Sequence, residues 1–305
     1  MINFKNTEVM GWEAAVRGMR NPMNSWEKSD SGKIYWNGTW YTPDPVLRSY
    51  FTDYGMNLLI GPNDLDLMRR LTAGGPVHAK YRRMITVYVD ITAPLYWWKE
   101  FDTYKVGTVA NSCSTMHKIA DKEFTLEDFS CEHLIDNNAL FIHNKGDFRS
   151  ISNLQFLMWT IDFLNENRRL YLETSDELKK TQESYIVVAL DAEEKSLKIR
   201  DLQKKKKQYW WQMIQLLPSS YNQKRTVMLN YEVLAHIYKD RKYHKLDEWR
   251  EHSVTMGVDL DYRNYSNMGF CDWIKTLPYP ELICGEHINN EKTTPDCFVP
   301  IPENK

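Results

Sequence analysis

Residues 83–94 read RMITVYVDITAP, and this stretch carries the clearest signal for the fold. β-Branched and aromatic residues alternate partly with polar residues over 83–91, which predicts a strand. Thr92 is a suitable N-cap and Pro94 suits a first helical turn, so we expect a helix over 95–105. A strand is therefore predicted to turn directly into a helix.

A second stretch repeats this order far downstream. Residues 217–241 read LPSSYNQKRTVMLNYEVLAHIYKDR. Pro218 predicts a turn, residues 224–229 predict a basic strand, and residues 231–241 predict a helix that ends in arginine.

Hydrophobic periodicity and turn residues predict the remaining elements. We expect strands over 2–10 and, as a hairpin around Asn37-Gly38, over 34–36 and 39–41; helices over 13–19, 65–71, 148–182, 193–217 and 246–256; a polar loop over 108–118; and an irregular tail after Tyr262.

The composition is that of a globular protein with a sizeable core. Of the 305 residues, 42% are hydrophobic and 26% are charged, which excludes intrinsic disorder as the main state. Lys and Arg total 39 against 41 Asp and Glu, so no strong basic field marks a general nucleic-acid coat protein. This charge balance is compatible with a local basic pocket. The run Lys204–Lys207 predicts a solvated helix face, with contact to an anion or RNA as the alternative.

Aromatic residues are abundant and glycines are few. The 11 Trp and 18 Tyr predict a bulky core that includes Trp97, Trp98 and Tyr104, with base-stacking or flavin-stacking pockets as the alternative. With 13 Gly and neither GxGxxG nor GxxxxGK[ST], the chain does not predict a glycine-rich nucleotide fold.

The five cysteines are scattered and never in CxxC spacing. This pattern predicts neither a disulfide framework nor a structural zinc site. The first residues lack an apolar signal-peptide core, and no window reaches 18 apolar residues, so we expect a cytoplasmic protein that does not enter the membrane.

No short motif assigns a catalytic residue. GxSxG and HExxH are absent. His244, Glu248 and His252 are spaced four apart, which would place them on one helix face as a metal face or as ordinary polar pairs; we favour the pairs and predict no metal. Cys113 is a candidate nucleophile, but no base can be assigned to it.

Four segments share a pattern with one enzyme family. Residues 9–26 predict a strand and a helix that ends in Ser and Trp, and His78 precedes a strand. Residues 86–94, TVYVDITAP, match a strand that runs into Ala-Pro, and residues 217–241 match a Leu-Pro turn, an Arg-bearing strand and an Asn-x-x-x-Leu helix. In these segments the sequence resembles the flavin-dependent thymidylate synthases. The stretch 120–200 matches more weakly and is longer than usual.

The signature of that family, R-H-R-x-x-S-x-N-E-x-S-x-R-Y, follows its Ala-Pro helix, and this chain departs from it. Counted without a gap, its successive positions hold Thr103, Tyr104 and Lys105, then Thr108, Ala110, Asn111, Cys113, Thr115 and Met116. A one-residue slip places Asn111 on Asn, Ser114 on Ser and His117 on Tyr, and both registers stay open. On either register, no arginine of the signature is kept.

The resemblance implies two groups of site residues. Those implied for the cofactor are His78, Thr103, Tyr104, Lys105 and His236. Those implied for the substrate nucleotide are Lys224, Arg225, Arg241, Cys113, Ser114 and Thr115. Arg presents a planar fork to a phosphate, whereas Lys is a point charge and Thr is neutral, so the loss of R-H-R predicts weak FAD binding.

Some of these residues also have a structural interpretation. Lys224 and Arg225 alternate on a strand, so only one of them can face a pocket. Arg241 lies in the charged run KDRKYHK, which also fits a solvated surface. His236 also fits a packed, hydrogen-bonded core histidine.

The resemblance implies an α+β fold with a central, mostly antiparallel sheet flanked by helices. It implies one domain over 1–262, enlarged over 120–200, with a tail over 263–305, and a homotetramer. It implies one-carbon transfer from methylenetetrahydrofolate to C5 of a pyrimidine nucleotide, dUMP or a relative, with FAD and NADPH. The alternative is a degenerate homologue that binds a nucleotide, nucleic acid or protein without catalysis.

Overall fold

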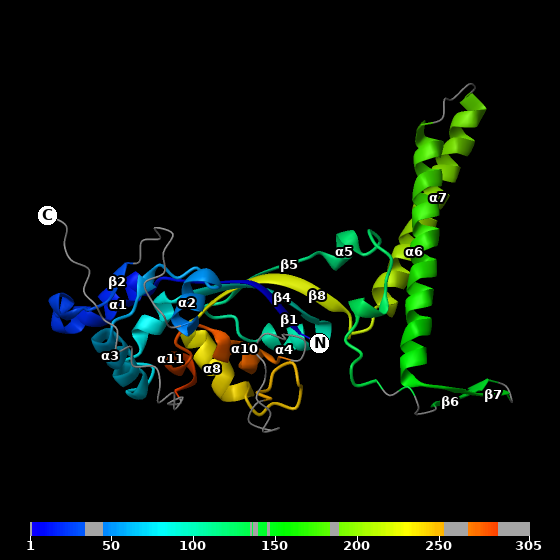
Figure 1. The fold of residues 1–305 in the computed structure, drawn as a ribbon. Coiled ribbons are helices and arrows are strands. Elements are labelled where there is room, and N and C mark those ends of the chain that lie inside the picture. Colours follow the sequence, from blue (N-terminus) through cyan, green and yellow to red (C-terminus); the bar gives the residue numbers. More distant parts are fainter. Residues whose placement is uncertain are drawn as a thin grey trace. The chain divides into compact units, whose positions relative to one another are not determined.

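The computed structural model describes residues 2–33, 45–134, 136, 140–144, 147–183, 189–252 and 268–285. Its chain divides into two units (Figure 1). The first unit comprises Met1, Ala93–Lys99 and Ser112–Gln223, and the second comprises Ile2–Thr92, Glu100–Asn111 and Lys224–Lys305. The hairpin predicted around Asn37-Gly38 lies outside the described residues.

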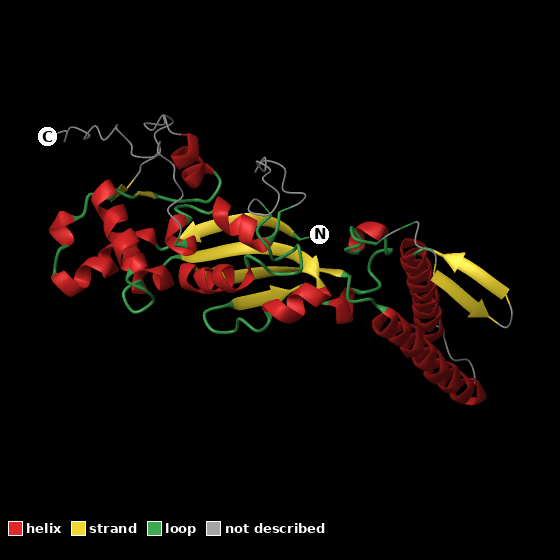
Figure 2. Ribbon diagram, turned by 90° about the horizontal axis from the view of Figure 1, so that it is seen from below, coloured by secondary structure: helices red, strands yellow, loops and turns green. Residues whose placement is uncertain are grey.

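A four-stranded sheet organises the second unit (Figure 2). In spatial order its strands are β1 (Asn3–Met10), β4 (Thr86–Pro94), β8 (Asn222–Asn230) and β5 (Val109–Ser112). β1 and β4 run antiparallel. β4 and β8 also run antiparallel, because backbone hydrogen bonds join Tyr231 to Ile85 at one end of the pair and Leu95 to Tyr221 at the other. The predicted α+β fold with a mostly antiparallel sheet is confirmed.

The two faces of this sheet differ in burial. In β4, Val87, Val89 and Ile91 are buried, whereas Tyr88 is exposed and Asp90 is half-buried. This alternation follows the two-residue period of a strand. Figure 1 places α8 (Tyr231–Arg241) and α10 (Phe270–Thr276) on one side of the sheet.

Aromatic side chains fill the core of the second unit. Trp249, Phe270 and Trp273 are buried, and the ring of Phe270 lies 5.4 Å from that of Trp249 and 5.1 Å from that of Trp273. Phe4 of β1 stacks on Trp273 at 4.9 Å. The abundant aromatic residues therefore build the bulky core that the composition predicts.

Further short elements complete the second unit. They are α1 (Trp12–Arg20), α2 (Pro45–Thr52), α3 (Pro62–Ala73), α11 (Glu281–Cys284), β2 (Gly32–Lys33), β3 (Leu58–Leu59) and the 3-10 turns η1 (Asn21–Met23), η2 (Trp26–Lys28) and η3 (Lys80–Met84).

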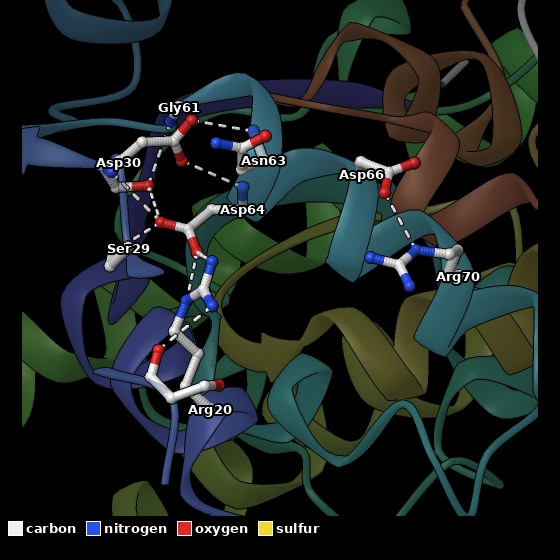
Figure 3. A network of polar contacts seen from close by, with 10 residues as sticks. Arg20, Ser29, Asp30, Gly61, Asn63, Asp64, Asp66 and Arg70 are labelled. Atoms are coloured by element: carbon white, nitrogen blue, oxygen red, sulfur yellow. Dashed lines mark hydrogen bonds and ion pairs between the residues drawn. The ribbon is translucent and has the colours of Figure 1, made fainter. Parts of the chain in front are cut away.

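A buried ion pair ties α1 to the start of α3 (Figure 3). Arg20 Nη2 lies 2.6 Å from Asp64 Oδ1, and the hydroxyls of Ser29 and Ser31 donate to Asp64 Oδ2 at 2.6 Å each. Burial alone raises the pKa of Asp64, but these hydrogen bonds and the Arg20 charge hold it below its usual value. Asp30 accepts two backbone N–H groups at the start of α3. The whole network is satisfied internally, so it serves structure.

Two long helices form a hairpin in the first unit. α6 (Asn153–Glu183) and α7 (Ala189–Leu216) pack against each other, with Leu157, Ile161 and Met213 buried beside Phe124 and Phe129. Both helices were predicted, although α6 begins after β7 rather than at residue 148. Trp97 and Trp98 are buried in this unit, as expected. Its other elements are α4 (Leu95–Phe101), α5 (Thr115–Lys118), η4 (Leu126–Asp128), β6 (Leu140–Asn144) and β7 (Asp147–Ile151).

The junction between β4 and α4 differs from the prediction. β4 continues through Pro94, with Thr92 paired opposite Asn3, so Thr92 does not cap a helix. The backbone N–H of Leu95 donates to the carbonyl of Tyr221, so pairing with the β8 end extends to the first residue of α4. Tertiary pairing has overridden the local capping signal.

Three further stretches differ from the prediction. The expected loop over 108–118 contains β5 and α5, because an exposed edge strand carries no hydrophobic alternation. Residues 246–252 form turns and bends rather than a helix, and the rest of the helix predicted over 246–256 lies outside the described residues. The stretch after Tyr262, expected to be irregular, contains α10 and α11, whose side chains are largely buried.

Candidate functional site

The end of α8 places Arg241 against the last turn of α4 and the residues that follow it. Its Nη1 donates to Glu100 Oε2 at 2.6 Å and its Nε donates to the hydroxyl of Tyr104 at 2.8 Å. Nη1 also lies 2.8 Å from His244 Nε2, and the guanidinium lies 5.0 Å from the ring centroid of buried Trp249. A cation at a helix C-terminus is favoured by the helix dipole. The guanidinium is thus held in one orientation.

One nitrogen of this guanidinium, Nη2, has no protein acceptor among the described residues. The contacts of Arg241 within the described residues use Nε and Nη1 and leave the two N–H groups of Nη2 unmatched. The side chain is 19% exposed. Nη2 can therefore donate hydrogen bonds to a ligand while Nε and Nη1 keep their present contacts.

Arg225 reaches the same segment from β8. Its Nη1 lies 2.7 Å from Asp102 Oδ1, and its side chain is 15% exposed. Tyr104 belongs to residues 103–105, where the family resemblance places R-H-R, and Glu100 and Asp102 lie just before them. The structure therefore brings the segment 100–105 together with Arg225 and Arg241.

Lys224 lies on the opposite face of the sheet. Its Nζ is 2.8 Å from Asp90 Oδ2, and the hydroxyl of Thr226 donates to Asp90 Oδ1 at 2.6 Å. Hydrogen bonds from Lys224, Thr226 and Asn6 lower the pKa of Asp90 to about 2. As the strand alternation predicts, Lys224 and Arg225 face different sides, and Arg225 shares the site with Arg241.

Carboxylates already balance the cations of this site. Arg225 pairs with Asp102 and Arg241 pairs with Glu100. Burial lowers the pKa of His244, which favours the neutral ring. The positive potential available to a phosphate is therefore much smaller than two arginines alone would supply.

The residues at the R-H-R positions fit FAD poorly. The hydroxyl of Thr103 donates to the carbonyl of Glu100, and that of Tyr104 accepts from Arg241. Only exposed Lys105 adds a charge. A diphosphate would thus meet one flexible lysine where the family supplies two arginines.

The two histidines implied for the cofactor lie on separate elements. His78 is exposed in the turn after α3, and its ring packs on Gly74. His236 is 61% exposed, so it is not the core histidine considered above, and its Nε2 lies 3.3 Å from Glu232 Oε1. Glu232 is buried, and Arg82 Nη1 lies 3.7 Å from its other oxygen. His236 therefore caps a buried acid–base pair that the sequence does not reveal.

The implied loop residues Cys113, Ser114 and Thr115 belong to the first unit. Cys113 is exposed, and its carbonyl accepts from Gln223 Nε2 at 2.9 Å. The hydroxyl of Ser114 accepts from the backbone N–H of His117 and so caps α5, of which Thr115 is the first residue. A structural role accounts for Ser114.

Metal binding by the His244, Glu248 and His252 series has no support. None of these three residues lies in a helix, so the common helix face does not form. His244 contacts Arg241, and His252 Nδ1 lies 2.7 Å from Asp272 Oδ2. No group of three potential metal ligands occurs among the described residues.

Sequence reasoning missed the acidic partners of the site. Glu100 and Asp102 stand at the C-terminal end of α4, where the helix dipole disfavours negative charge. Acidic residues at a helix C-terminus were an available sign that a cation lies opposite. No feature of the sequence indicated that Trp249 packs against Arg241.

Comparison with known proteins gives similar folds at low identity. No family model matches the chain, and no curated protein matches it. A Helicobacter pylori flavin-dependent thymidylate synthase with FAD and dUMP covers 93% of this chain and 97% of its own, at 12% identity and a TM-score of 0.44. Another structure of that enzyme covers 80% of this chain and 85% of its own, at 13% identity and a TM-score of 0.41.

A UMP/dUMP methylase from Streptomyces cacaoi, bound with 5-Br dUMP, is also similar. It covers 92% of this chain and 93% of its own, at 13% identity and a TM-score of 0.38. The likeness to these structures concerns the fold. In the described part of the chain, no helix is long and apolar enough to span a bilayer.

Proposed function

We propose that this protein binds a pyrimidine nucleotide, dUMP or a close relative, without catalysing a reaction on it. It would be a degenerate relative of the flavin-dependent thymidylate synthases. The observation that carries the proposal is Arg241, whose guanidinium is fixed on three sides while Nη2 keeps two unmatched donors. A fixed arginine loses little conformational entropy when it binds a phosphate or carbonyl oxygen.

The charge balance of the site argues against tight binding. Glu100 and Asp102 offset the two arginines that face the segment 100–105. The loss of each charge-assisted contact to a ligand costs roughly 1.5–3 kcal/mol. We therefore expect a nucleotide site that is weaker than one with unpaired arginines.

One-carbon transfer is the second candidate function. The convergence of Arg225 and Arg241 on the segment after α4 favours it, because the resemblance assigns the nucleotide and the cofactor to these segments. Methylenetetrahydrofolate would supply the carbon unit for C5 of the pyrimidine, with FAD and NADPH as the redox pair. The poor match of Thr103, Tyr104 and Lys105 to FAD weighs against it.

Calorimetric titration with dUMP tests the nucleotide site. We expect Arg241→Ala to weaken binding at least tenfold, or about 1.4 kcal/mol. Lys205→Ala removes an equal charge from exposed Lys205 on α7, and we expect it to change the affinity little. Equal effects of both substitutions, or no binding by the parent protein, would show that the site does not exist.

An activity assay separates the two candidates. The protein is incubated with dUMP, methylenetetrahydrofolate, FAD and NADPH, and dTMP is quantified. Binding of dUMP without dTMP formation supports the non-catalytic function. Formation of dTMP that is lost in Arg241→Ala would establish one-carbon transfer instead.

A further inference from the structure

We propose that one face of α7 binds single-stranded nucleic acid. Arg200, Lys204, Lys207 and Trp211 are spaced i, i+4, i+7 and i+11, which places them on one side of the helix. All four are exposed, and Trp211 retains 41% of its accessible surface. These four residues form the α7 basic face.

Other parts of α7 are used to hold the hairpin together. Leu202 and Met213 are buried, and Lys206 Nζ lies 5.0 Å above the ring centroid of Tyr171 on α6. The helical period therefore distributes the lysines of the run Lys204–Lys207 over different sides of α7. Lys206 packs against α6, whereas Lys204 and Lys207 extend from the α7 basic face into solvent.

Several other cations of the hairpin are paired with carboxylates, unlike those of the α7 basic face. Arg169 lies 2.6 Å from both Glu166 and Glu173, and Lys198 lies 2.9 Å from Glu177. Within the residues that the structure describes, no carboxylate oxygen lies within 4.0 Å of the three cations of the α7 basic face. Their charge is free to attract an anionic partner.

The spacing and chemistry of this face favour a polynucleotide. The three cations follow one another at about 6 and 4.5 Å along the helix axis, so they present a row of charges to a chain of phosphates. Lysine and arginine contacts to such a chain are driven by counterion release. Trp211 extends the row with an exposed indole on which an unpaired base can stack.

Trp211 favours single-stranded over double-stranded nucleic acid. In a duplex the faces of the bases are stacked on one another, whereas a single strand can present a base to Trp211. An anionic membrane would favour a broad apolar face beside the cations, and the α7 basic face has one aromatic residue.

Fluorescence anisotropy with a labelled oligo(dT) of about 16 nucleotides tests the proposal. We expect the triple variant Arg200→Gln/Lys204→Gln/Lys207→Gln to bind at least tenfold more weakly. Its plot of log affinity against log salt should be shallower by about 2, because each lost phosphate contact removes about 0.7 from the slope. Trp211→Ala should weaken binding about tenfold and leave the salt slope unchanged.

The matched control is Lys28→Gln/Lys179→Gln/Lys180→Gln. It removes the same charge from exposed positions outside the α7 basic face, namely Lys28 of η2 and Lys179 and Lys180 of α6. Glutamine is a good helix former, so both triple variants should keep their helices. The proposal is overturned if the two triple variants bind alike. It is equally overturned if anionic phosphatidylserine vesicles bind the parent protein and oligo(dT) does not.

Discussion

At the scale of single residues, Arg241 shows how a surface charge becomes a fixed donor. Its sequence context, KDRKYHK, also fitted a solvated surface. Glu100 and Tyr104 hold two of its nitrogens, and Trp249 supports the plane of the guanidinium. This combination orients the residue while it also cancels part of its charge.

Substitution of Glu100 by Gln should separate these two effects. Gln keeps the length of the side chain and an acceptor oxygen for Arg241 but removes the competing negative charge. We expect dUMP to bind about threefold more tightly, since a partly exposed ion pair is worth less than about 1 kcal/mol. The measurement is calorimetry, with Glu27→Gln at an exposed position as the control. Weaker binding would indicate that Glu100 contributes to the site.

Asp90 predicts an acid-dependent loss of stability. Its pKa is lowered from 3.8 to about 2 by hydrogen bonds from Lys224, Thr226 and Asn6. A depressed pKa contributes stability that is present above the unfolded pKa and is lost as the pH falls toward the folded pKa. The stability difference between the parent protein and Asp90→Asn should therefore shrink between about pH 5 and pH 2. Urea unfolding at several pH values measures it, and a constant difference would contradict this assignment.

At the scale of elements, the segment after α4 decides the cofactor. Thr103 and Tyr104 bond to Glu100 and Arg241, which leaves Lys105 as the only cation of these three positions. We expect FAD to be lost during gel filtration, because one exposed lysine cannot replace two arginines at a diphosphate. Absorbance in the flavin band before and after filtration measures retention. Stoichiometric FAD after filtration would refute this and favour the catalytic function.

At the scale of the whole molecule, the exposed face of the four-stranded sheet, which carries Met10 and Tyr88, suggests how copies of the chain could assemble. The resemblance implies a homotetramer, and Met10 and Tyr88 are 48% and 40% exposed on β1 and β4. Exposed apolar side chains that lie together often mark an interface. We expect light scattering at micromolar concentration to give a multiple of the 36.2 kDa chain mass. A mass equal to one chain would exclude any site shared between copies.

Local sequence patterns by themselves determined the two long helices and the three main strands of this protein. The strand before Ala93-Pro94, the basic strand and α8 were predictable because β-branched runs, helical periodicity and turn residues act over a few neighbours. The alternation of Lys224 and Arg225 was predictable for the same reason. The aromatic core followed from composition, since many large apolar rings can be accommodated only by burial.

The tertiary structure alone decided the chemistry of the site. Arg241 and Glu100 are 141 positions apart, and Arg225 and Asp102 are 123 apart, so no local pattern could pair them. The expected helix over 246–256 gave way to turns and bends over the described residues 246–252, and Trp249 packs against Phe270. Long-range packing and charge pairing override local propensity wherever their free energies exceed the small differences between local conformations.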